Sequence, residues 1–216
     1  MGELIDLFLH LDVHIATMVE TTGPWAYAVL FAVIFCETGL VVTPFLPGDS
    51  LLFAAGAVAA IGGLDVDLLA RLLFVAAVAG DAVNYTIGKR VGRSAAIRWA
   101  RPEHLARTEA FYARHGGKAV VLARFVPIVR TFAPFVAGMG AMSYGRFTAF
   151  NLLGAALWVG GFVFAGYFFG NVPLVRDHFT LVVLGIVALS VAPLLVRLLP
   201  SGRFLTVRSA SRKVAL

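Results

Sequence analysis

The chain is built from apolar runs, and prolines interrupt two of them. The first interrupted run covers residues 24–62 and contains Pro44 and Pro47. An uninterrupted apolar run follows at 68–88, and a helix of about 20 such residues is long enough to cross a bilayer. The pattern therefore predicts a proline-broken helical hairpin followed by a transmembrane helix.

The same order recurs in the second half of the chain. An interrupted run at 118–142 contains Pro127 and Pro134, and an uninterrupted run follows at 147–170. Each arm of this second broken run has about 9–12 residues, or about 14–18 Å of helix. Because the hydrocarbon core is about 30 Å thick, such arms reach only to its middle. We therefore interpret both broken runs as re-entrant hairpins. In the first run, a longer hairpin arm at 24–36 and a separate span that includes these residues are both open.

Four further segments complete the predicted organisation. Amphipathic sequence predicts an interfacial helix at 3–20. A surface helix is predicted at about 102–115, between a proline and a pair of glycines. A final membrane span is predicted at 179–199, and a basic tail follows at 200–216.

The composition identifies the broad class of protein. Hydrophobic residues make up 60% of the 216 residues and charged residues 14%. Soluble domains have about 45–50% and about 25%, respectively. The mean hydropathy is +0.88. These values indicate an integral membrane protein. Cys36 is the only cysteine, which excludes an internal disulfide, and we expect it to pack as a small apolar residue.

The net charge of +6 is unevenly distributed along the chain. Residues 1–70 contain eight acidic residues and no Lys or Arg, whereas residues 89–118 contain eight basic residues. Basic residues flank membrane spans on the cytoplasmic side. We therefore expect the segment at 89–118 and the C-terminus to be cytoplasmic, near anionic lipid head groups. The basic clusters flank apolar spans, so we expect no nucleic-acid partner. The N-terminus has no basic residue that would assign it to one side.

These charges orient the two hairpins in opposite directions. With 89–118 in the cytoplasm, the hairpin at 118–142 enters from the inside, and the span at 68–88 runs from outside to inside. The hairpin at 24–62 then enters from the outside. We predict an all-α, polytopic membrane protein with two inverted repeats whose hairpins meet near the midplane. The predicted extents are 1–88 for the first repeat, 89–170 for the second and 1–216 for the single membrane domain.

Four charged residues lie in the two broken runs. Glu37 and Asp49 are in the first, and Arg124 and Arg130 are in the second. An Asp or Arg at membrane depth costs about 2.5–3.5 kcal/mol, so four unpaired charges would cost about 10–14 kcal/mol. We expect the two carboxylates to face and neutralise the two arginines. Ion pairs that only stabilise the hairpins are the alternative, although ionisable residues inside membranes usually mark functional sites.

Other polar residues are secondary candidates for the site. Asp81, Asn84 and Tyr85 lie on the first predicted span, and Asn151 lies on the second. For Asp81 and Asn84, interhelical hydrogen bonding and a substrate role are both open. Tyr85, like Trp158, is expected mainly to pack, and Asn151 is expected to cap or cross-link helices.

The sequence gives little support for a metal site or for catalysis. His10 and His14 share one helical face, yet no further ligand is evident. We therefore expect an interfacial pair, with no metal and no cofactor. Cys36 has no nearby histidine to activate it, and no phosphate-binding glycine loop is apparent. For these reasons we do not expect an enzyme.

Several segments together resemble the DedA family of bacterial membrane proteins. They are ETGLVVTPFLPGD at 37–49, GDAVNYTIG at 80–88, RFVPIVRTFAPFVAG at 124–138 and NLLGAALW at 151–158. These segments run in family order over most of the chain. The family is grouped with the eukaryotic VTT-domain lipid scramblases, and its members are described with facing re-entrant loops in inverted repeats.

The resemblance implies lipid transport across the bacterial cytoplasmic membrane. Members of the family return undecaprenyl phosphate to the cytoplasmic face, and others are linked to phospholipid movement and to the proton gradient. The family's essential acidic pair matches Glu37 and Asp49, and its arginine pair matches Arg124 and Arg130. The arginines are accordingly expected to bind a lipid phosphate. The carboxylates are expected to act as counter-ions and proton carriers.

Two alternatives use the same residues. One is a phospholipid scramblase or flippase. The other is a proton- or cation-coupled transporter of a small solute, which needs no phosphate recognition. The lipid carried, the carboxylate that takes the proton and the oligomeric state do not follow from the sequence.

Overall fold

The computed structural model describes residues 17, 19, 21–40, 48–99, 102–172 and 185. Within these residues the secondary structure is helical and contains no strand, in agreement with the predicted all-α class. The elements are α3 (Trp25–Gly39), α4 (Gly48–Ala60), α5 (Val66–Trp99), α6 (Pro102–His115), η1 (Gly116–Lys118), α7 (Ala119–Ala123), α8 (Pro127–Val136), η2 (Ala137–Ala141) and α9 (Tyr144–Gly170).

Some predicted features lie outside the described residues. Apart from three isolated residues, these are the interfacial helix at 3–20, with His10 and His14, the prolines Pro44 and Pro47, the final span at 179–199 and the tail at 200–216.

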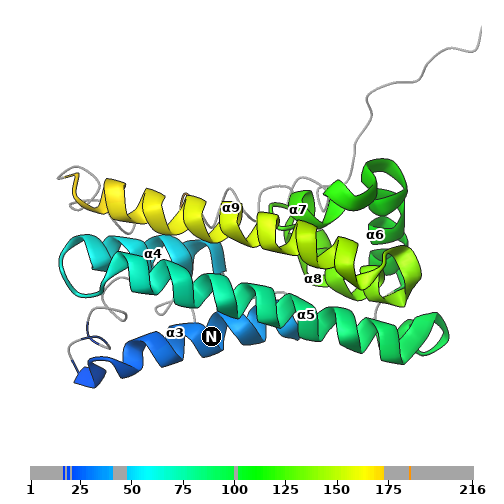
Figure 1. Ribbon diagram of the computed structural model, residues 1–216, viewed down its shortest axis with the longest axis horizontal. Helices are drawn as coiled ribbons and strands as arrows, with labels where there is room; N and C mark the ends of the chain where they lie inside the picture. The colour runs from blue at the N-terminus through cyan, green and yellow to red at the C-terminus, as the bar shows by residue number, and fades with distance from the viewer. Residues whose placement is uncertain are drawn as a thin grey trace, which may run out of the picture.

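Two long helices, α5 and α9, lie side by side along the length of the molecule (Figure 1). Among the described residues, α9 is the helix that is both long and apolar enough to cross a membrane. Glycines of α9 allow close packing against α4. A Cβ built on Gly166 would lie 2.0 Å from the carbonyl oxygen of Phe53 in α4, and one on Gly170 would lie 2.8 Å from Cα of Ala57. Residues without a side chain therefore let α4 and α9 touch backbone to backbone.

Helix α5 is longer than the sequence predicted. The span was expected to end at residue 88, before the basic segment, but the helix continues through Lys89 and Arg90 to Trp99. The prediction placed the end of the helix at the first charges. Charges mark where a helix leaves the membrane, but Lys and Arg are good helix formers and do not end it. The next proline is Pro102, which begins α6.

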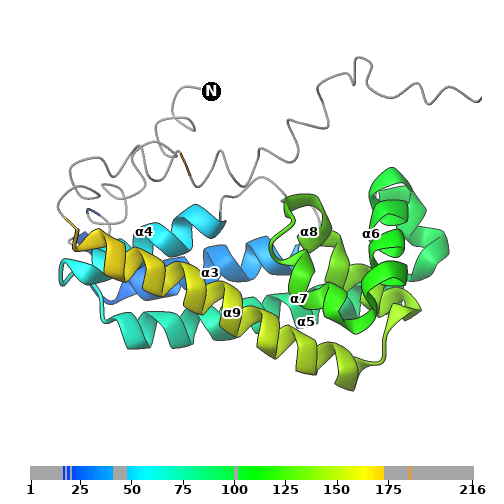
Figure 2. The ribbon, with the colours of Figure 1, turned by 90° about the horizontal axis from the view of Figure 1, so that it is seen from above.

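The first hairpin consists of α3 and α4. Their 15 and 13 residues correspond to about 22 Å and about 20 Å of helix, less than the hydrocarbon thickness of about 30 Å. Helix α3 packs on α5, and α4 packs on the C-terminal half of α9. The hairpin therefore contacts both long helices, toward one end of the molecule (Figure 2).

The second hairpin is built from α7, α8 and η2. Pro127 begins α8, as a helix-starting proline does, but Pro134 lies inside α8 and does not break it. The prediction of a break at Pro134 was therefore wrong. Pro134 lacks the N–H that would bond the carbonyl of Arg130, and α8 gives way three residues later to the π-helix η2, in which Gly140 has a φ of 123°.

The second hairpin meets the long helices in the complementary way. Helix α7 packs on α9, whereas α8 and η2 pack on α5. A Cβ built on Gly138 of η2 would lie 2.0 Å from the carbonyl oxygen of Tyr85, and one on Gly88 would lie 2.1 Å from that of Phe135. In each hairpin, then, the first arm packs on the long helix that follows it, and the second arm crosses the other long helix at glycines.

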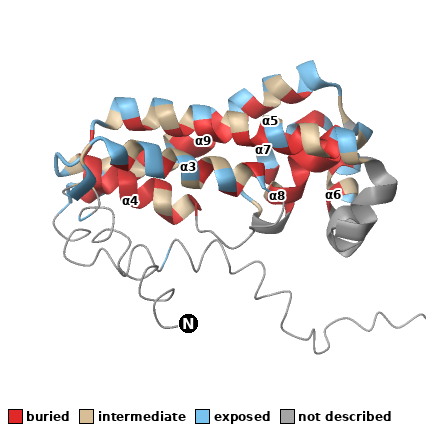
Figure 3. Cartoon of the chain, turned by 90° about the horizontal axis from the view of Figure 1, so that it is seen from below, coloured by how far each residue is buried: buried red, intermediate tan, exposed pale blue. Residues whose placement is uncertain are grey.

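Buried residues line the facing sides of the helices and form two apolar clusters (Figure 3). One cluster joins α3, α4, the first part of α5 and the later part of α9. The other joins the later part of α5, the second hairpin, α6 and the start of α9. On α5, Asp81 and Asn84 lie between the residues of the two clusters, and on α9 Asn151 does so. The fold therefore places a polar layer between two apolar ones.

Candidate functional site

Arg130 is the first centre of this polar layer. It lies in the first turn of α8 and forms ion pairs with Glu37 at the end of α3 and Asp49 at the start of α4. The distance from Arg130 Nη1 to Asp49 Oδ1 is 2.9 Å. Glu37 is buried, and its Oε1 also accepts a hydrogen bond from the backbone N–H of Gly48 at 3.3 Å. One arginine of the second hairpin is thus held by both carboxylates of the first.

Arg124 is the second centre, and its partners differ from those predicted. Its Nη2 lies 2.5 Å from Asp81 Oδ2 on α5 and donates a hydrogen bond of 2.7 Å to Asn151 Oδ1 on α9. Asn151 in turn donates to the carbonyl of Val78. The sequence paired two carboxylates with two arginines. In the structure three carboxylates share two arginines, and Asp81 was only a secondary candidate. We refer to Glu37, Asp49, Asp81, Arg124 and Arg130 as the charge cluster.

Trp158 joins the two centres, a role that the sequence did not assign to it. The guanidinium carbons of Arg124 and Arg130 lie 5.6 Å and 5.4 Å from the centre of its ring, within range of a cation–π interaction. Its Nε1 donates a hydrogen bond of 2.7 Å to Asp49 Oδ1. Trp158 follows Asn151 by two helical turns, so the two residues share a face of α9. That spacing was the available sign of its role.

Asn84 links the two hairpins. Its Nδ2 donates to the backbone carbonyls of Thr38 in α3 and Thr131 in α8, both at 3.0 Å, and its side chain is fully buried. Of the two roles left open for Asn84, the structure shows the hydrogen-bonding one. Tyr85 does not join the charge cluster. It donates to the carbonyl of Met142 and stacks on Phe147, as expected for a packing residue.

Helix α6 covers the second hairpin and coincides with the range predicted for a surface helix. Tyr112 of α6 donates a hydrogen bond of 2.9 Å to the carbonyl of Ala133 in α8. Burial, with a smaller contribution from the charge of Asp81, raises the pKa of Tyr112 above its ordinary value. The phenol therefore stays protonated and keeps this hydrogen bond throughout the neutral pH range.

A cavity of about 20 Å³ lies inside the charge cluster. It is lined by Glu37, Thr38, Asp81, Arg124, Arg130, Thr131 and Trp158. This volume is enough for about one water molecule. Among the described atoms, Glu37 Oε2 and Arg124 Nε are buried without a hydrogen-bond partner. A group larger than a water molecule does not fit this cavity in the present conformation.

Gly48 is the residue that lets Glu37 reach this position, and replacing it gives a first prediction. A Cβ built on Gly48 would lie 2.1 Å from Glu37 Oε2. We expect Gly48→Ala to push the carboxylate away from Arg130 and to destabilise the protein by about 1–3 kcal/mol. The thermal unfolding midpoint of purified protein in detergent measures this.

The matched control for Gly48→Ala is Gly161→Ala. A Cβ on Gly161 of α9 meets no atom within 4 Å. Alanine at that helical position should leave stability unchanged or raise it by up to about 1 kcal/mol. Equal effects of the two substitutions would contradict the placement of Glu37 against Gly48.

The fold and the buried charges first define a class of protein: an all-helical membrane protein with an ion-paired cluster enclosed between two short-armed hairpins. The family follows from comparison of the sequence. The VTT domain family matches residues 46–168, and the chain belongs to this family, which includes the DedA proteins. The resemblance seen in the sequence segments is thereby confirmed.

Three relatives show how far the similarity extends. "Protein DedA" of Escherichia coli strain K12 is 55% identical over 196 residues, covering 88% of this chain and 90% of that protein. An uncharacterized membrane protein of Mycobacterium leprae is 42% identical over 168 residues, covering 76% and 75%. "Inner membrane protein YghB" of E. coli K12 is 35% identical over 171 residues, covering 77% and 75%. No solved structure matches. The names of these relatives support a membrane location for the chain.

Proposed function

We propose that this protein carries a phosphate-headed lipid, undecaprenyl phosphate, across the bacterial cytoplasmic membrane. The observation that carries the proposal is Arg130, a partly buried cation held by two separate carboxylates from the opposite hairpin. Proteins of the VTT and DedA family are commonly linked to membrane lipid transport. The substrate of this chain, and its action as a transporter and not an enzyme, are part of the proposal.

In the proposed mechanism, the lipid phosphate replaces the carboxylates on Arg130. A guanidinium presents a planar fork of N–H donors that matches two phosphate oxygens. Arg124 adds a second cation beside it, and the ring of Trp158 holds both arginines in place. The head group thus passes through a polar layer, while the lipid tail stays in the surrounding hydrocarbon.

Charge balance in the cluster favours coupling to protons. Three carboxylates and two arginines leave a formal net charge of −1 in the closed cluster. Adding an anionic phosphate to a negative cluster inside a membrane is costly. Protonation of Glu37 and Asp49 as they release Arg130 changes the cluster to +1, which a phosphate monoanion neutralises. We therefore propose that these two carboxylates take up protons when the lipid binds.

The topology proposed here gives the cluster access to both faces of the membrane. The hairpins enter from opposite sides as inverted repeats, with the basic segments and the C-terminus in the cytoplasm beside anionic lipid heads. Their crossed packing on α5 and α9 supports this arrangement. Separation of one hairpin at a time opens the cluster to one side and then to the other.

A reconstitution experiment tests the proposed function. Purified protein is placed in liposomes with a polyprenyl phosphate, and a membrane-impermeant phosphatase is added outside. If the protein moves the lipid, the enzyme hydrolyses the whole pool. Without transport it hydrolyses only the outer-leaflet pool, which would refute the proposal. An imposed pH gradient should change the rate.

Two controls separate the alternatives. A phospholipid with a reporter on its head group tests general scrambling, which predicts equal rates for both lipids. Ion or solute flux in liposomes without polyprenyl phosphate tests the small-solute transporter. The proposed function predicts faster movement of the polyprenyl phosphate and no solute flux.

A further inference from the structure

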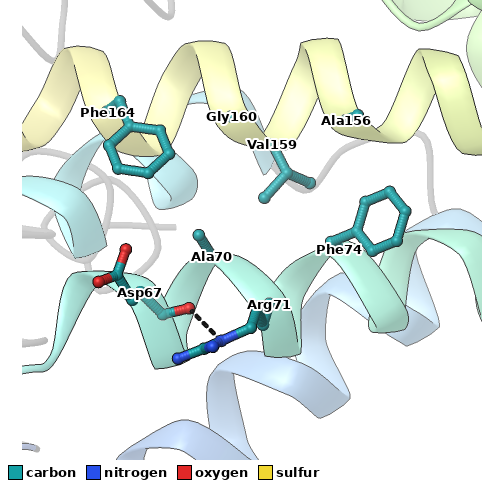
Figure 4. Close-up of a pocket in the computed structure, with 8 residues that line it drawn as sticks. All are labelled: Asp67, Ala70, Arg71, Phe74, Ala156, Val159, Gly160 and Phe164. Carbon is teal, nitrogen blue, oxygen red and sulfur yellow. Dashed lines mark hydrogen bonds between the residues drawn. The ribbon is translucent and has the colours of Figure 1, made fainter.

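A second polar site lies away from the charge cluster, at one end of a groove between α5 and α9. The groove has a volume of about 490 Å³, within the range of about 300–1,000 Å³ typical of small-molecule sites. Figure 4 shows its walls: Ala70 and Val159 point into it, and the rings of Phe164 and Phe74 lie toward its two ends. Apart from one polar end, the lining is apolar.

The polar end is formed by Asp67 and Arg71, one helical turn apart on α5. Both residues are exposed. Arg71 Nε donates a hydrogen bond of 3.1 Å to the backbone carbonyl of Asp67 (Figure 4). This bond holds the Nε end of the guanidinium group. Within the described part of the chain, neither residue forms an ion pair. One positive and one negative group therefore stand together at the end of an apolar groove.

The position of Arg71 along α5 sets its depth in the membrane. Arg71 precedes Asp81 of the charge cluster by ten residues, which is about 15 Å of helix. This is half of the hydrocarbon thickness of about 30 Å. With the cluster at the midplane, as proposed above, Arg71 and Asp67 lie at the level of the lipid head groups. The groove then runs from that level toward the cluster.

We propose that this groove binds one zwitterionic phospholipid, a membrane lipid whose head carries both a phosphate and an ammonium group. Arg71 binds the phosphate, and Asp67 binds the ammonium group. One acyl chain lies along the groove between Phe164 and Phe74. A head group with only negative charge fits less well because Asp67 repels it. The depth argument rests on the proposed function, but the charge pair and the groove do not.

Adjacent glycines on α9 provide a matched test of the groove. A Cβ on Gly160 or on Gly161 meets no atom within 4 Å, so each position tolerates a larger side chain. Only Gly160 lines the groove. Gly160→Leu should fill it and lower phospholipid binding by roughly fivefold or more, as expected for the loss of one to two kcal/mol of apolar contact, while Gly161→Leu leaves binding unchanged. Equal binding by the two variants would overturn the proposal.

The charge pair is tested with lipids of different head groups. Native mass spectrometry of the protein in detergent, titrated with phosphatidylethanolamine or phosphatidylglycerol, gives the relative affinities. We expect the zwitterionic lipid to bind more tightly to the unaltered protein. Asp67→Asn should weaken or reverse that preference by up to roughly fivefold, the contribution of one exposed charge pair. Because the basic segments also attract anionic lipid, the change on substitution decides the assignment. An Asp67→Asn variant with the same ratio of affinities for the two lipids as the unaltered protein would refute it, whatever the outcome of the transport assay.

Discussion

Replacing Arg130 with glutamine is expected to abolish lipid transport and to destabilise the protein. The substitution leaves the buried Glu37 and the partly buried Asp49 without their cation, and breaking a buried ion pair typically costs about 3–5 kcal/mol. Arg130→Lys keeps the charge but not the planar fork of N–H donors. We therefore expect a stability between those of Arg130→Gln and the unaltered protein, and much slower transport than in the unaltered protein. Phosphatase-coupled liposome flux and thermal unfolding measure the two effects.

The matched control is Arg146→Gln, because Arg146 is exposed near the start of α9. It removes the same charge outside the cluster and should change neither stability nor transport. A transport rate for Arg130→Gln close to that of Arg146→Gln would contradict the role of Arg130 in binding the lipid.

A triple substitution separates binding from simple structural support. Glu37→Gln, Asp49→Asn and Arg130→Gln together remove the ion pairs without leaving an unpaired charge. Replacing a whole buried ion pair by neutral groups is often nearly neutral for stability. If the ion pairs only stabilise the hairpins, this variant should be stable and active. We expect it to be stable and inactive, because no cation remains at Arg130 to bind the phosphate.

The second large effect concerns the pairing of Arg124 with Asp81. We expect Arg124→Gln and Asp81→Asn each to destabilise the protein by about 3–5 kcal/mol, because each leaves the partner's charge buried. The double substitution should lower the free energy of unfolding by less than the sum of the two single substitutions. The difference is a coupling energy on the order of 1–3 kcal/mol, measured by unfolding in detergent.

A second double-mutant cycle, with Arg124 and Asp49, provides the comparison. The sequence predicted that a carboxylate of the first hairpin neutralises this arginine, whereas the structure places Asp49 on Arg130. We therefore expect a clearly smaller coupling energy for Arg124 with Asp49 than for Arg124 with Asp81. Equal coupling in both cycles would contradict the division of the cluster into two centres.

Part of the fold can be predicted from local sequence. The errors in that prediction also have local causes. The range of α6 follows from the proline and the pair of glycines that bound its segment. The end of α5 was misplaced because charge was used as a sign of where a helix ends. Pro134 was expected to break its helix because a proline inside a helix removes a backbone hydrogen bond, yet α8 continues through it to Val136.

The candidate site was only half predictable. Glu37, Asp49 and Arg130 stand out because a charge inside an apolar run must be compensated wherever it lies. The roles of Asp81, Asn84 and Trp158 do not stand out in this way. Each lies on a long helix, where a polar or aromatic side chain can equally well face lipid, a neighbouring helix or the site.

By itself, the sequence determined that the chain is a membrane protein with two broken apolar runs and buried charges that need partners. These properties depend on composition and on short segments, because the hydrophobicity of each residue and the length of each apolar run can be read without knowing which residues meet. Only the tertiary structure decided which charges meet. Arg130 and Asp49 are 81 positions apart, and Arg124 and Asp81 are 43 apart. Their contacts depend on how each hairpin packs against both long helices at the glycines where the helices touch.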